Sequence, residues 1–517
     1  MIGARIGNNK YLRTIGLLTI MLMAVVRLIF CHSFVLSQSI RAGLVSFRSS
    51  TRVVCDGRTT TRIMSSNHQH HGDLAANFGS QLQQVATSFS RLATTKPHGL
   101  HFYMGNEAGD ADSIISSLAL AYTKNLEYSS SSSDDDAHNN IPLVSIPRSD
   151  MALRRETVLL LQMAGVSTEQ LLYLDDASVQ SVFKVDTSTS SSMDMDLTLV
   201  DHNKIRSGLS HLSDRVVEIV DHHADEEAHR HIVPHRRRIA FEHGHATAGS
   251  ACTLVTEILL EHIVCSTNDK IDAGVSLGLL GVILIDTMNM SVEAGKGTDR
   301  DANAISNLVA HTDWTQLRPC FALDGKAADR IFPKGLGTAP DCTELHDYLR
   351  DCKFDPEFWK ELSVKDCLRI DYKRFESSSD ADKPDNVFGL SSILLSLDDF
   401  MSKSHLTNSV TEFMQSANVA LLGVMSMKIG VDGTPNREML LFGSENESDS
   451  DPVDSMVQYL TGDEKALFLN MKDVPIGTDV LANDDSPNLI TMRRLYQGNT
   501  KGSRKQVAPV MLEYYKN

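Results

Sequence analysis

Short apolar runs alternate with amphipathic segments over residues 100–290 of this chain. The runs with the length of buried strands are HFYMG (101–105), IPLVSI (141–146), LLYL (171–174), LTLV (197–200), VVEIV (216–220) and LLGVILID (279–286). Apolar residues recur three and four positions apart, as in helices, in residues 73–95, 112–126, 151–165 and 250–264. Strands that alternate with helices predict an α/β fold with a parallel sheet.

A second apolar pattern follows a stretch rich in Gly and Pro, FPKGLGTAPDC (332–342), which we interpret as a linker. Beyond it, the strands VALLGVMSMKIG (419–430) and MLLFG (439–443) predict a smaller α/β unit. Because 517 residues exceed one core, we expect a leader (1–72), a first domain (98–330), a linker (331–344) and a second domain (345–517). Three low-complexity segments predict surface loops: residues 129–140, 186–196 and 444–451.

The composition indicates a soluble globular chain with an acidic body. Hydrophobic residues make up 42% and charged residues 22%. Residues 1–72 hold nine of the 49 Lys and Arg but one of the 66 Asp and Glu, so their net charge is +8, against −25 for the rest. An acidic body disfavours nucleic-acid binding, and a polyanionic substrate would need a basic patch or bound cations. The eight cysteines form no CxxC pair, and we expect free thiols in a reducing compartment.

The first 72 residues have the features of a targeting leader. Basic residues precede an apolar run from Ile15 to Val26, which is as long as a signal-peptide core and too short to span a membrane comfortably. The following segment is rich in Ser and Arg, as transit peptides are, so we predict a two-part, plastid-type presequence. A mitochondrial presequence, a secretory signal and a membrane anchor interrupted by Arg27 are the alternatives. An internal start at Met64 would leave the protein in the cytoplasm.

Potential metal ligands follow several of the expected strands of the first domain. They are Asn106, Asp110, Asp112, Asp201, Asp221, His222, His223 and Asp286, and Gly249 and Ser250 stand at an expected helix start. Ligands of parallel α/β sheets bind outside the carboxyl ends of the strands, so we expect these side chains to converge. Carboxylate and imidazole suit Mn²⁺, Mg²⁺ or Co²⁺, and two such ions can clamp a phosphoryl group. A single Asp after a strand is usually a turn or capping residue, but several together favour a metal site.

These motifs carry a family resemblance. GNEAGDADS, VDHN, VDHH and LIDT, in this order, resemble the four motifs of the DHH phosphoesterase superfamily. RIDYKRF (369–375) and GSRKQVAP (502–509) resemble segments of the DHHA2 domain. The resemblance extends over residues 98–517 and indicates the branch of family II pyrophosphatases, yeast-type exopolyphosphatases and prune proteins. It implies a parallel-sheet DHH domain and a smaller α/β DHHA2 domain with the active site in the cleft between them.

The resemblance also implies roles for individual residues. Two divalent ions, Mn²⁺ or Mg²⁺ with Co²⁺ possible, would be bound by Asn106, Asp110, Asp112, Asp201, His222 and Asp286. Asp201 would bridge both ions, and His223 would contact the phosphate or leaving-group oxygen. The anionic tail of the substrate would be held from the second domain by Lys373, Arg504 and Lys505.

Two positions depart from the pattern of the pyrophosphatases. Asn106 stands where they have His, which is typical of exopolyphosphatases and prune proteins. In HRHIVPHRRR (229–238), the residues Arg236, Arg237 and Arg238 form either a basic rim for a polyphosphate chain or a solvated basic turn or edge strand. Further metal ligation by the histidines of this stretch is the weaker alternative.

We therefore expect a metal-dependent exopolyphosphatase that releases terminal orthophosphate from inorganic polyphosphate by metal-activated water. Pyrophosphate hydrolysis and a prune-type phosphodiesterase acting on short polyphosphates or cyclic nucleotides are the closest alternatives. A non-catalytic regulatory scaffold is the alternative from another class, against which the complete set of ligands argues. We expect no nucleic-acid partner and no membrane contact of the mature body. The sequence does not indicate the oligomeric state.

Overall fold

The computed structural model describes most of the chain beyond the leader. The described residues are 77–92, 99–129, 139–184, 195–265, 270–318, 323–376, 387–430, 435–444, 451–476 and 490–515. The predicted leader with Met64 and most of the three low-complexity segments lie outside these ranges. No described helix is both long and apolar enough to cross a membrane. Cys252, Cys342, Cys352 and Cys367 are free thiols, as expected.

The first sheet has five parallel strands in the order β2-β1-β3-β4-β5. They are β1 (Leu100–Met104), β2 (Asn139–Leu143), β3 (Met195–Val200), β4 (Val216–Asp221) and β5 (Arg237–Ile239). The predicted parallel α/β sheet is therefore confirmed. Because the pairs are parallel, the carboxyl ends of β1, β3 and β4 meet at one edge of the sheet, where the predicted ligands follow them.

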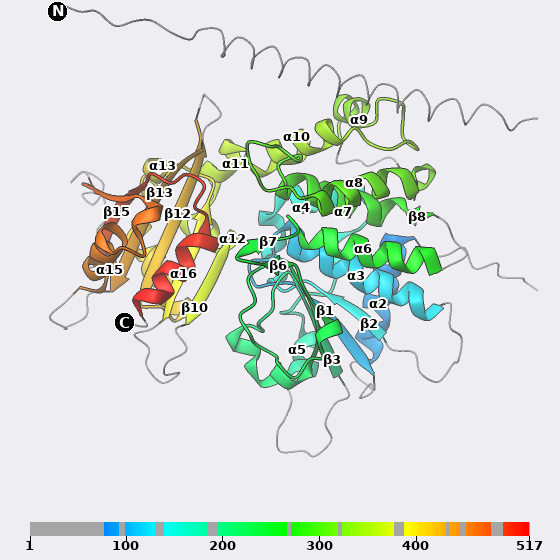
Figure 1. Cartoon of the computed structure of the whole chain (residues 1–517), viewed down its shortest axis with the longest axis horizontal. Helices are drawn as coiled ribbons and strands as arrows, with labels where there is room; N and C mark the ends of the chain where they lie inside the picture. The colour runs from blue at the N-terminus through cyan, green and yellow to red at the C-terminus, as the bar shows by residue number, and fades with distance from the viewer. Residues whose placement is uncertain are drawn as a thin grey trace, which may run out of the picture. The chain divides into compact units, whose positions relative to one another are not determined.

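Apolar side chains cover both faces of this sheet. Along β1, Phe102 and Met104 are buried in one cluster and Tyr103 in the other, as strand geometry requires. Helices α3 (Ala111–Ser129), α6 (Ala251–Cys265) and α7 (Ala273–Asp286) pack together on one side, and α5 (Ala177–Phe183) contributes to the cluster on the other (Figure 1). The remaining helices of this part are α2 (Phe78–Leu92), α4 (Arg155–Met163), α8 (Asp299–His311), α9 (Gly325–Ile331) and α10 (Cys342–Lys353).

Several short elements complete this part. Two small sheets are formed by β6 (Phe241–Glu242) with β7 (His245–Ala246) and by β8 (Ile271–Asp272) with β9 (Thr312–Asp313). Short 3₁₀ helices lie at Arg148–Leu153, Thr168–Gln170, Ser207–Arg215, Pro234–Arg236 and Trp314–Gln316.

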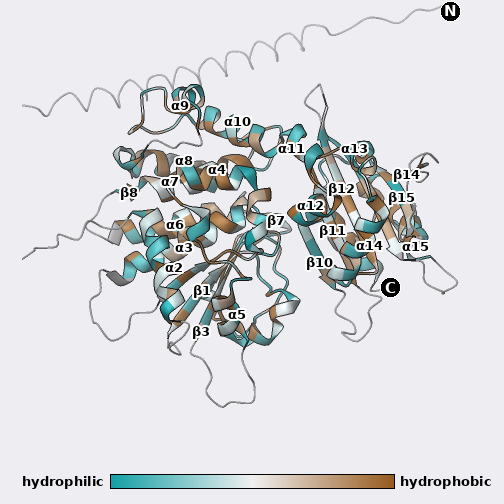
Figure 2. Cartoon of the chain, turned by 180° about the vertical axis from the view of Figure 1, so that it is seen from behind, coloured by the Kyte–Doolittle hydropathy of each residue, from teal (hydrophilic) through white to brown (hydrophobic). Residues whose placement is uncertain are grey.

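The prediction of a strand at residues 279–286 is wrong, because this run is the second half of helix α7. Asp272 caps the helix by accepting hydrogen bonds from the backbone N–H groups of Gly274 and Val275. Residues 273–284 are all buried, so the helix is apolar on every side and shows no helical period (Figure 2). The expected strand at 171–174 is also absent, since Tyr173 forms a single bridge with Val144.

The second sheet has six strands of mixed direction in the order β10-β11-β12-β13-β15-β14. They are β10 (Tyr372–Glu376), β11 (Val387–Ile393), β12 (Leu421–Ile429), β13 (Pro435–Ser444), β14 (Met471–Val474) and β15 (Ile490–Gln497). Its helices are α11 (Pro356–Glu361), α12 (Val364–Ile370), α13 (Leu397–Met401), α14 (Leu406–Ala417), α15 (Pro452–Gly462) and α16 (Arg504–Tyr514), with a 3₁₀ turn at Leu467–Leu469. Apolar clusters again lie on both faces, so the second α/β unit forms as predicted.

The first hydrophobic core extends beyond the predicted linker at residues 331–344. Ile331 and Phe332 are buried in it, as are Leu345 and Leu349 of α10, which packs against α4 and α7. The stretch rich in Gly and Pro is thus a connection between two helices of one core. The second core begins with Trp359 of α11, so the change of core falls between α10 and α11.

We predict that Gly281→Leu destabilises the protein by overpacking the contact of α7 with α4 and α10. A Cβ atom at Gly281 would lie 2.7 Å from Cδ1 of Leu160 and 3.1 Å from Cδ1 of Leu349. The expected loss is about 1–3 kcal/mol in the free energy of unfolding, measured by denaturant titration. Gly462→Leu is the matched control, because no atom lies within 4 Å of a Cβ there. Equal losses in the two variants would contradict this account of the contact.

Candidate metal and phosphate site

The carboxylate of Asp112 is held by the start of helix α6. Its Oδ1 accepts hydrogen bonds from Oγ of Ser250 (2.7 Å) and N of Cys252 (2.9 Å), and its Oδ2 from N of Ala251 (2.8 Å). Unpaired N–H groups and the helix dipole stabilise a negative charge at such an N-terminus. The expected helix start at Ser250 therefore has a definite task, which is to fix one carboxylate. The neighbouring Asp110 caps α3 through its Oδ1.

Asn106 contacts Asp201 through its amide nitrogen. Its Nδ2 donates to Oδ2 of Asp201 over 2.8 Å, while its Oδ1 accepts from the backbone N–H groups of Ala108 (2.9 Å) and Gly109 (3.3 Å). In this arrangement the oxygen of Asn106 is already occupied, and the side chain orients Asp201. Metal ligation by Asn106 stays a prediction.

Asp201 lies buried directly after β3 in an unusual backbone conformation. Its φ of 64° is in the left-handed region, which a residue other than Gly adopts rarely and often at functional sites. Its Oδ1 has no hydrogen bond in the described structure, although Nε2 of His222 lies at 3.4 Å and Nδ1 of His223 at 3.5 Å. Burial, followed by the charge of Asp112, raises the pKa of Asp201 well above its ordinary value.

The ring of His222 has a defined orientation. Its Nδ1 lies 3.0 Å from the carbonyl oxygen of Ala248, which only accepts, so Nδ1 carries the proton in the neutral ring. Nε2 then has the free lone pair that a metal ligand needs, and it lies 3.7 Å from Oδ2 of Asp112. Burial and Lys505 lower the pKa of His222, but the carboxylates of Asp201 and Asp112 outweigh them and raise it to about 9.

His223 is oriented by Asp221, the carboxylate that precedes the histidine pair. Oδ1 of Asp221 lies 2.7 Å from Nδ1 of His223 and accepts its proton in a hydrogen bond, which leaves Nε2 as the other functional atom. Asn203 donates from Nδ2 to Oδ2 of Asp221 over 2.6 Å. Burial alone would raise the pKa of Asp221, but His223 holds it below its ordinary value. Burial and the charge of Lys505 lower the pKa of His223 to about 3.

Asp286 is the last residue of α7 and not the end of a strand. Its Oδ2 is buried and makes no hydrogen bond to any described residue. Burial and the nearby charges of Asp112 and Asp110 raise its pKa to about 8. A carboxylate in this setting lacks a cation that would stabilise its charge.

The donor set fits a divalent cation. Asp201, His222 and His223 offer ligand atoms that all lie within 4.8 Å of one another. Two buried carboxylate oxygens, Oδ1 of Asp201 and Oδ2 of Asp286, have no hydrogen-bond donor in the described structure. Buried polar atoms of native proteins usually have a partner, and a cation would supply one to each. The charge of Asp110 also acts on Asp201 and Asp286 and raises the pKa of both.

The three basic residues predicted from the second domain have different surroundings. Nζ of Lys505, in the first turn of α16, lies 3.5 Å from Nε2 of His222. Lys373 of β10 is half-buried, and its ammonium makes no hydrogen bond to a described residue. Arg504 donates to the carbonyl oxygen of Asp371 (2.7 Å) and to its Oδ1 (2.6 Å). Lys505 and Lys373 are therefore free to bind an anion, whereas the guanidinium of Arg504 is engaged; substrate contact by Arg504 stays a prediction.

The sequence did not reveal the task of Arg154. This guanidinium is buried and donates to four carbonyl oxygens, those of Ala108 (2.6 Å), Gly109 (2.6 Å), Asp150 (2.9 Å) and Ile370 (2.8 Å). It thus connects the loop that bears Asp110 with the end of α12. Nothing in the spacing of the motifs points to Arg154, because its partners are backbone atoms.

Two of the three arginines of the expected basic rim are paired. Arg237 donates to both oxygens of Asp225 and to the carbonyl oxygens of Ala228 and His229, and Arg238 pairs with Glu261. Arg236 is exposed. Arg237 and Arg238 begin β5 at the edge of the sheet, so the interpretation as an edge strand describes them better than a rim that binds polyphosphate.

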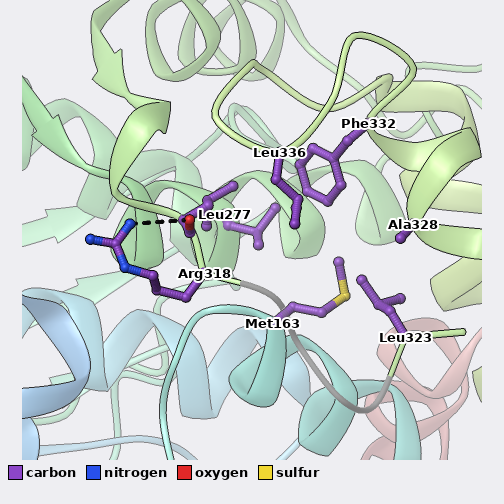
Figure 3. Close-up of a pocket in the computed structure, with 8 residues that line it drawn as sticks. Met163, Leu277, Arg318, Leu323, Ala328, Phe332 and Leu336 are labelled. Carbon is purple, nitrogen blue, oxygen red and sulfur yellow. Dashed lines mark hydrogen bonds between the residues drawn. The ribbon is translucent and has the colours of Figure 1, made fainter. Parts of the chain in front are cut away.

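An apolar pocket of about 150 Å³ lies elsewhere in the first domain (Figure 3). Its walls include Met163, Leu277, Leu323 and Phe332. The guanidinium of Arg318 at its edge donates to the carbonyl oxygen of Leu317 over 3.4 Å. Such an apolar lining does not suit a phosphate group.

We predict that Asp286→Asn stabilises the metal-free protein in a pH-dependent way. The pKa of Asp286 in the folded state (about 8) exceeds the ordinary 3.8, so its contribution to stability is present below pH 4 and is lost as the pH rises towards 8. Thermal or denaturant unfolding should show an advantage of the variant that grows by about 2 kcal/mol between pH 6 and pH 8.

The exposed Asp473 of β14 supplies the control. Asp473→Asn should show no such pH dependence, and saturating Mn²⁺ should stabilise the wild type more than Asp286→Asn. A constant difference at every pH would contradict the assignment of a buried, unpaired carboxylate.

Two family models match the chain. Residues 102–282 match the N-terminal domain of the DHH family, and residues 356–514 match the DHHA2 domain. The matches cover the five-stranded and the six-stranded sheet, respectively, apart from the first residues of β1. Asp286 lies four residues beyond the first match, at the end of the same helix α7.

Several known proteins are similar to this chain. Exopolyphosphatase PRUNE1 of Mus musculus is 26% identical over 424 residues, which cover 82% of this chain and 77% of that protein. A putative exopolyphosphatase of Schizosaccharomyces pombe is 26% identical over 457 residues, which cover 86% and 98%. Among solved structures, a putative family II inorganic pyrophosphatase of Methanococcus jannaschii aligns with 81% of this chain and 100% of that chain, at 14% identity and a TM-score of 0.46.

Proposed function

Since the chain belongs to the DHH phosphoesterase superfamily, in the branch of exopolyphosphatases and prune proteins, we propose that it is a metal-dependent exopolyphosphatase. It would release terminal orthophosphate from inorganic polyphosphate by hydrolysis of a phosphoanhydride bond. Its substrate is then a linear chain of phosphoryl groups with closely spaced negative charges.

One observation carries this proposal. The buried carboxylate oxygens of Asp201 and Asp286 lack a donor, and the ammonium of Lys505 from the second domain lies 3.5 Å from Nε2 of the neighbouring His222, with no ion pair to a described carboxylate. A phosphate group that is held by divalent ions on one side and by a basic side chain on the other needs carboxylates to bind those ions and an ammonium or guanidinium opposite them.

Five residues of the first domain would hold the divalent ions: Asp110, Asp112, Asp201, His222 and Asp286. We propose two ions, Mn²⁺ or Mg²⁺, as in the sequence-based expectation. When bound, such ions lower the pKa of a water molecule and neutralise phosphoryl oxygens. The helix start at Ser250 and the amide of Asn106 orient Asp112 and Asp201 for this task.

His223 would contact the substrate from beside these ligands. Asp221 fixes its Nδ1, so Nε2 is the atom that meets a phosphate oxygen. The charge of a bound phosphate favours the protonated ring, in which Nε2–H donates to that oxygen. Lys505 and Lys373 would bind the oxygens of the leaving phosphoryl group as charged donors.

We predict that Asp201→Asn abolishes phosphate release. The full-length protein should release orthophosphate from tripolyphosphate and long polyphosphate with Mn²⁺ or Mg²⁺, and the variant should be slower by about a thousandfold or more. Asp473→Asn, which alters an exposed carboxylate of β14, serves as the control with unchanged activity. The measurement is release of orthophosphate from pyrophosphate, tripolyphosphate, long polyphosphate and cyclic AMP, compared at one metal concentration.

Each outcome assigns the function. A clear preference for pyrophosphate or for cyclic AMP would replace our proposal by one of the two related activities. No turnover with either metal would favour the regulatory scaffold. The plastid-type leader of residues 1–72 remains a separate proposal, which imaging of the full-length and the Met64-started protein would test.

A further inference from the structure

Arg437 of β13 is a partly buried cation without a counter-charge. Its Nε donates to the carbonyl oxygen of Thr500 over 2.7 Å, and no carboxylate of a described residue pairs with it. Burial lowers the pKa of Arg437, and no acidic group opposes this effect. Other arginines of the second domain are paired, for example Arg494 with Glu438 and Arg504 with Asp371. An unpaired guanidinium in such a place is unfavourable unless an anion joins it.

The contact with Thr500 links Arg437 to the candidate site. Thr500 lies three residues before Ser503, which caps helix α16, and Lys505 follows in the first turn of that helix. Nζ of Lys505 reaches His222, so the loop held by Arg437 is continuous with the segment that meets the first domain. Arg437 thus holds the loop that leads into the first turn of α16, where Lys505 lies.

Lys296 brings a further cation from the first domain. Its backbone lies against Gly249, which directly precedes the Ser250 that binds Asp112, and the charges of Asp286, Arg437 and Lys505 act on its ammonium. No described residue forms an ion pair with it. Lys296, Arg437 and Lys505 are thus three cations from three separate segments, each connected to the candidate site or to the loop that enters it.

The backbone of Lys296 is fixed against the site. Its carbonyl oxygen would lie only 2.9 Å from a Cβ atom at Gly249, so the two backbones touch. The N–H of Gly249 donates to Asp301, which also forms the capping box with Thr298 at the start of α8. Gly249 directly precedes Ser250, which binds Asp112. The position of Lys296 relative to the carboxylates is therefore defined by packing, although its side chain reaches the surface.

We propose that Lys296 and Arg437 form a phosphate subsite that holds the third phosphoryl group of the substrate chain. This inference rests on the proposed function, in which the ligands of the first domain hold the terminal group and Lys505 with Lys373 hold the second. A chain of three or more phosphoryl groups fills the additional subsite, whereas pyrophosphate is too short. The two residues thereby select for polyphosphate over pyrophosphate.

The charge distribution supports this assignment. The chain has a net charge of −17, so a polyphosphate anion is repelled by most of the surface. A local set of cations without paired carboxylates overcomes this repulsion at one place. The guanidinium supplies several fixed donors for phosphate oxygens, and the ammonium of Lys296 supplies a compact charge on a flexible stem.

Arg437→Gln and Lys296→Met test the proposal. Each should raise the KM for tripolyphosphate about tenfold or more, with kcat little changed, and should leave kcat/KM for pyrophosphate within about twofold of the wild type. Arg437→Lys should recover part of the loss, and the exposed position of Lys296 protects that variant from misfolding. The matched control is Arg493→Gln, which should have no effect. Arg493 lies on the adjacent strand β15 and is paired with Asp454 of α15.

The double variant supplies a second criterion. If both side chains bind the same phosphoryl group, the factor by which the KM for tripolyphosphate rises in the double variant Arg437→Gln with Lys296→Met should be smaller than the product of the factors in the two single variants. Unchanged KM for tripolyphosphate in both single variants, or equal losses with pyrophosphate, would overturn the proposal.

Binding in the absence of metal separates this inference from the proposed function. Calorimetry of the metal-free, full-length protein with tripolyphosphate should show weaker binding for both variants than for the wild type. If the protein hydrolyses polyphosphate but the variants bind and turn over tripolyphosphate normally, the subsite is wrong and the function stands. If no hydrolysis occurs but the variants lose binding, the subsite stands and the function is wrong.

Discussion

The mutual repulsion of buried carboxylates is the constraint on which the site depends. Burial and the charge of Asp112 raise the pKa values of both Asp201 and Asp286, so these groups resist carrying their charges together. The fold tolerates this concentration of negative charge because it holds Asp112 and Asp201 each with its own hydrogen bonds. Asp112 receives three hydrogen bonds from the start of α6, and Asp201 receives one from Asn106. Oδ1 of Asp201 and Oδ2 of Asp286 remain without a hydrogen-bond donor, and a divalent cation would be a suitable partner for them.

The architecture follows from the need to bring these groups to one place. Parallel strands β1, β3 and β4 end at one edge of the sheet, which delivers the loop of Asn106, then Asp201, then Asp221 to His223. The fourth contribution comes from a helix: α7 is buried along its length and ends at Asp286. Arg154 joins this assembly to the second unit by binding the loop of Ala108 and Gly109 together with Ile370. This buried side chain therefore helps to relate the ligand loop to the domain that supplies Lys505.

The sequence predicted the parallel sheet and the polar residues that follow β1, β3 and β4, because these depend on local pattern and on the rule that sites lie at the ends of parallel strands. It failed at residues 279–286, since an apolar run buried on all sides shows no period that distinguishes helix from strand. The hydrogen-bonding roles of Asn106, Arg154 and Arg504 were also inaccessible. Each depends on which atom of a long-range partner is within reach, as when Arg504 binds Asp371 and not a free anion. The core boundary after α10 was missed because Gly and Pro mark a turn equally well inside a domain and between domains.

The protein keeps its two opposite sets of charges largely unpaired with each other. Lys505 lies against the ring of His222, and Arg437 binds a backbone carbonyl; neither forms an ion pair with a described carboxylate. Direct ion pairs between the sets would stabilise the empty site and would have to break before a substrate could bind. Holding them apart leaves the empty site less stable than it could be, and metal ions and a polyanion then gain the interactions that the protein does not make with itself. The same reasoning explains why the basic groups belong to several segments: a phosphate chain presents charge on all sides, and no single strand or helix can surround it.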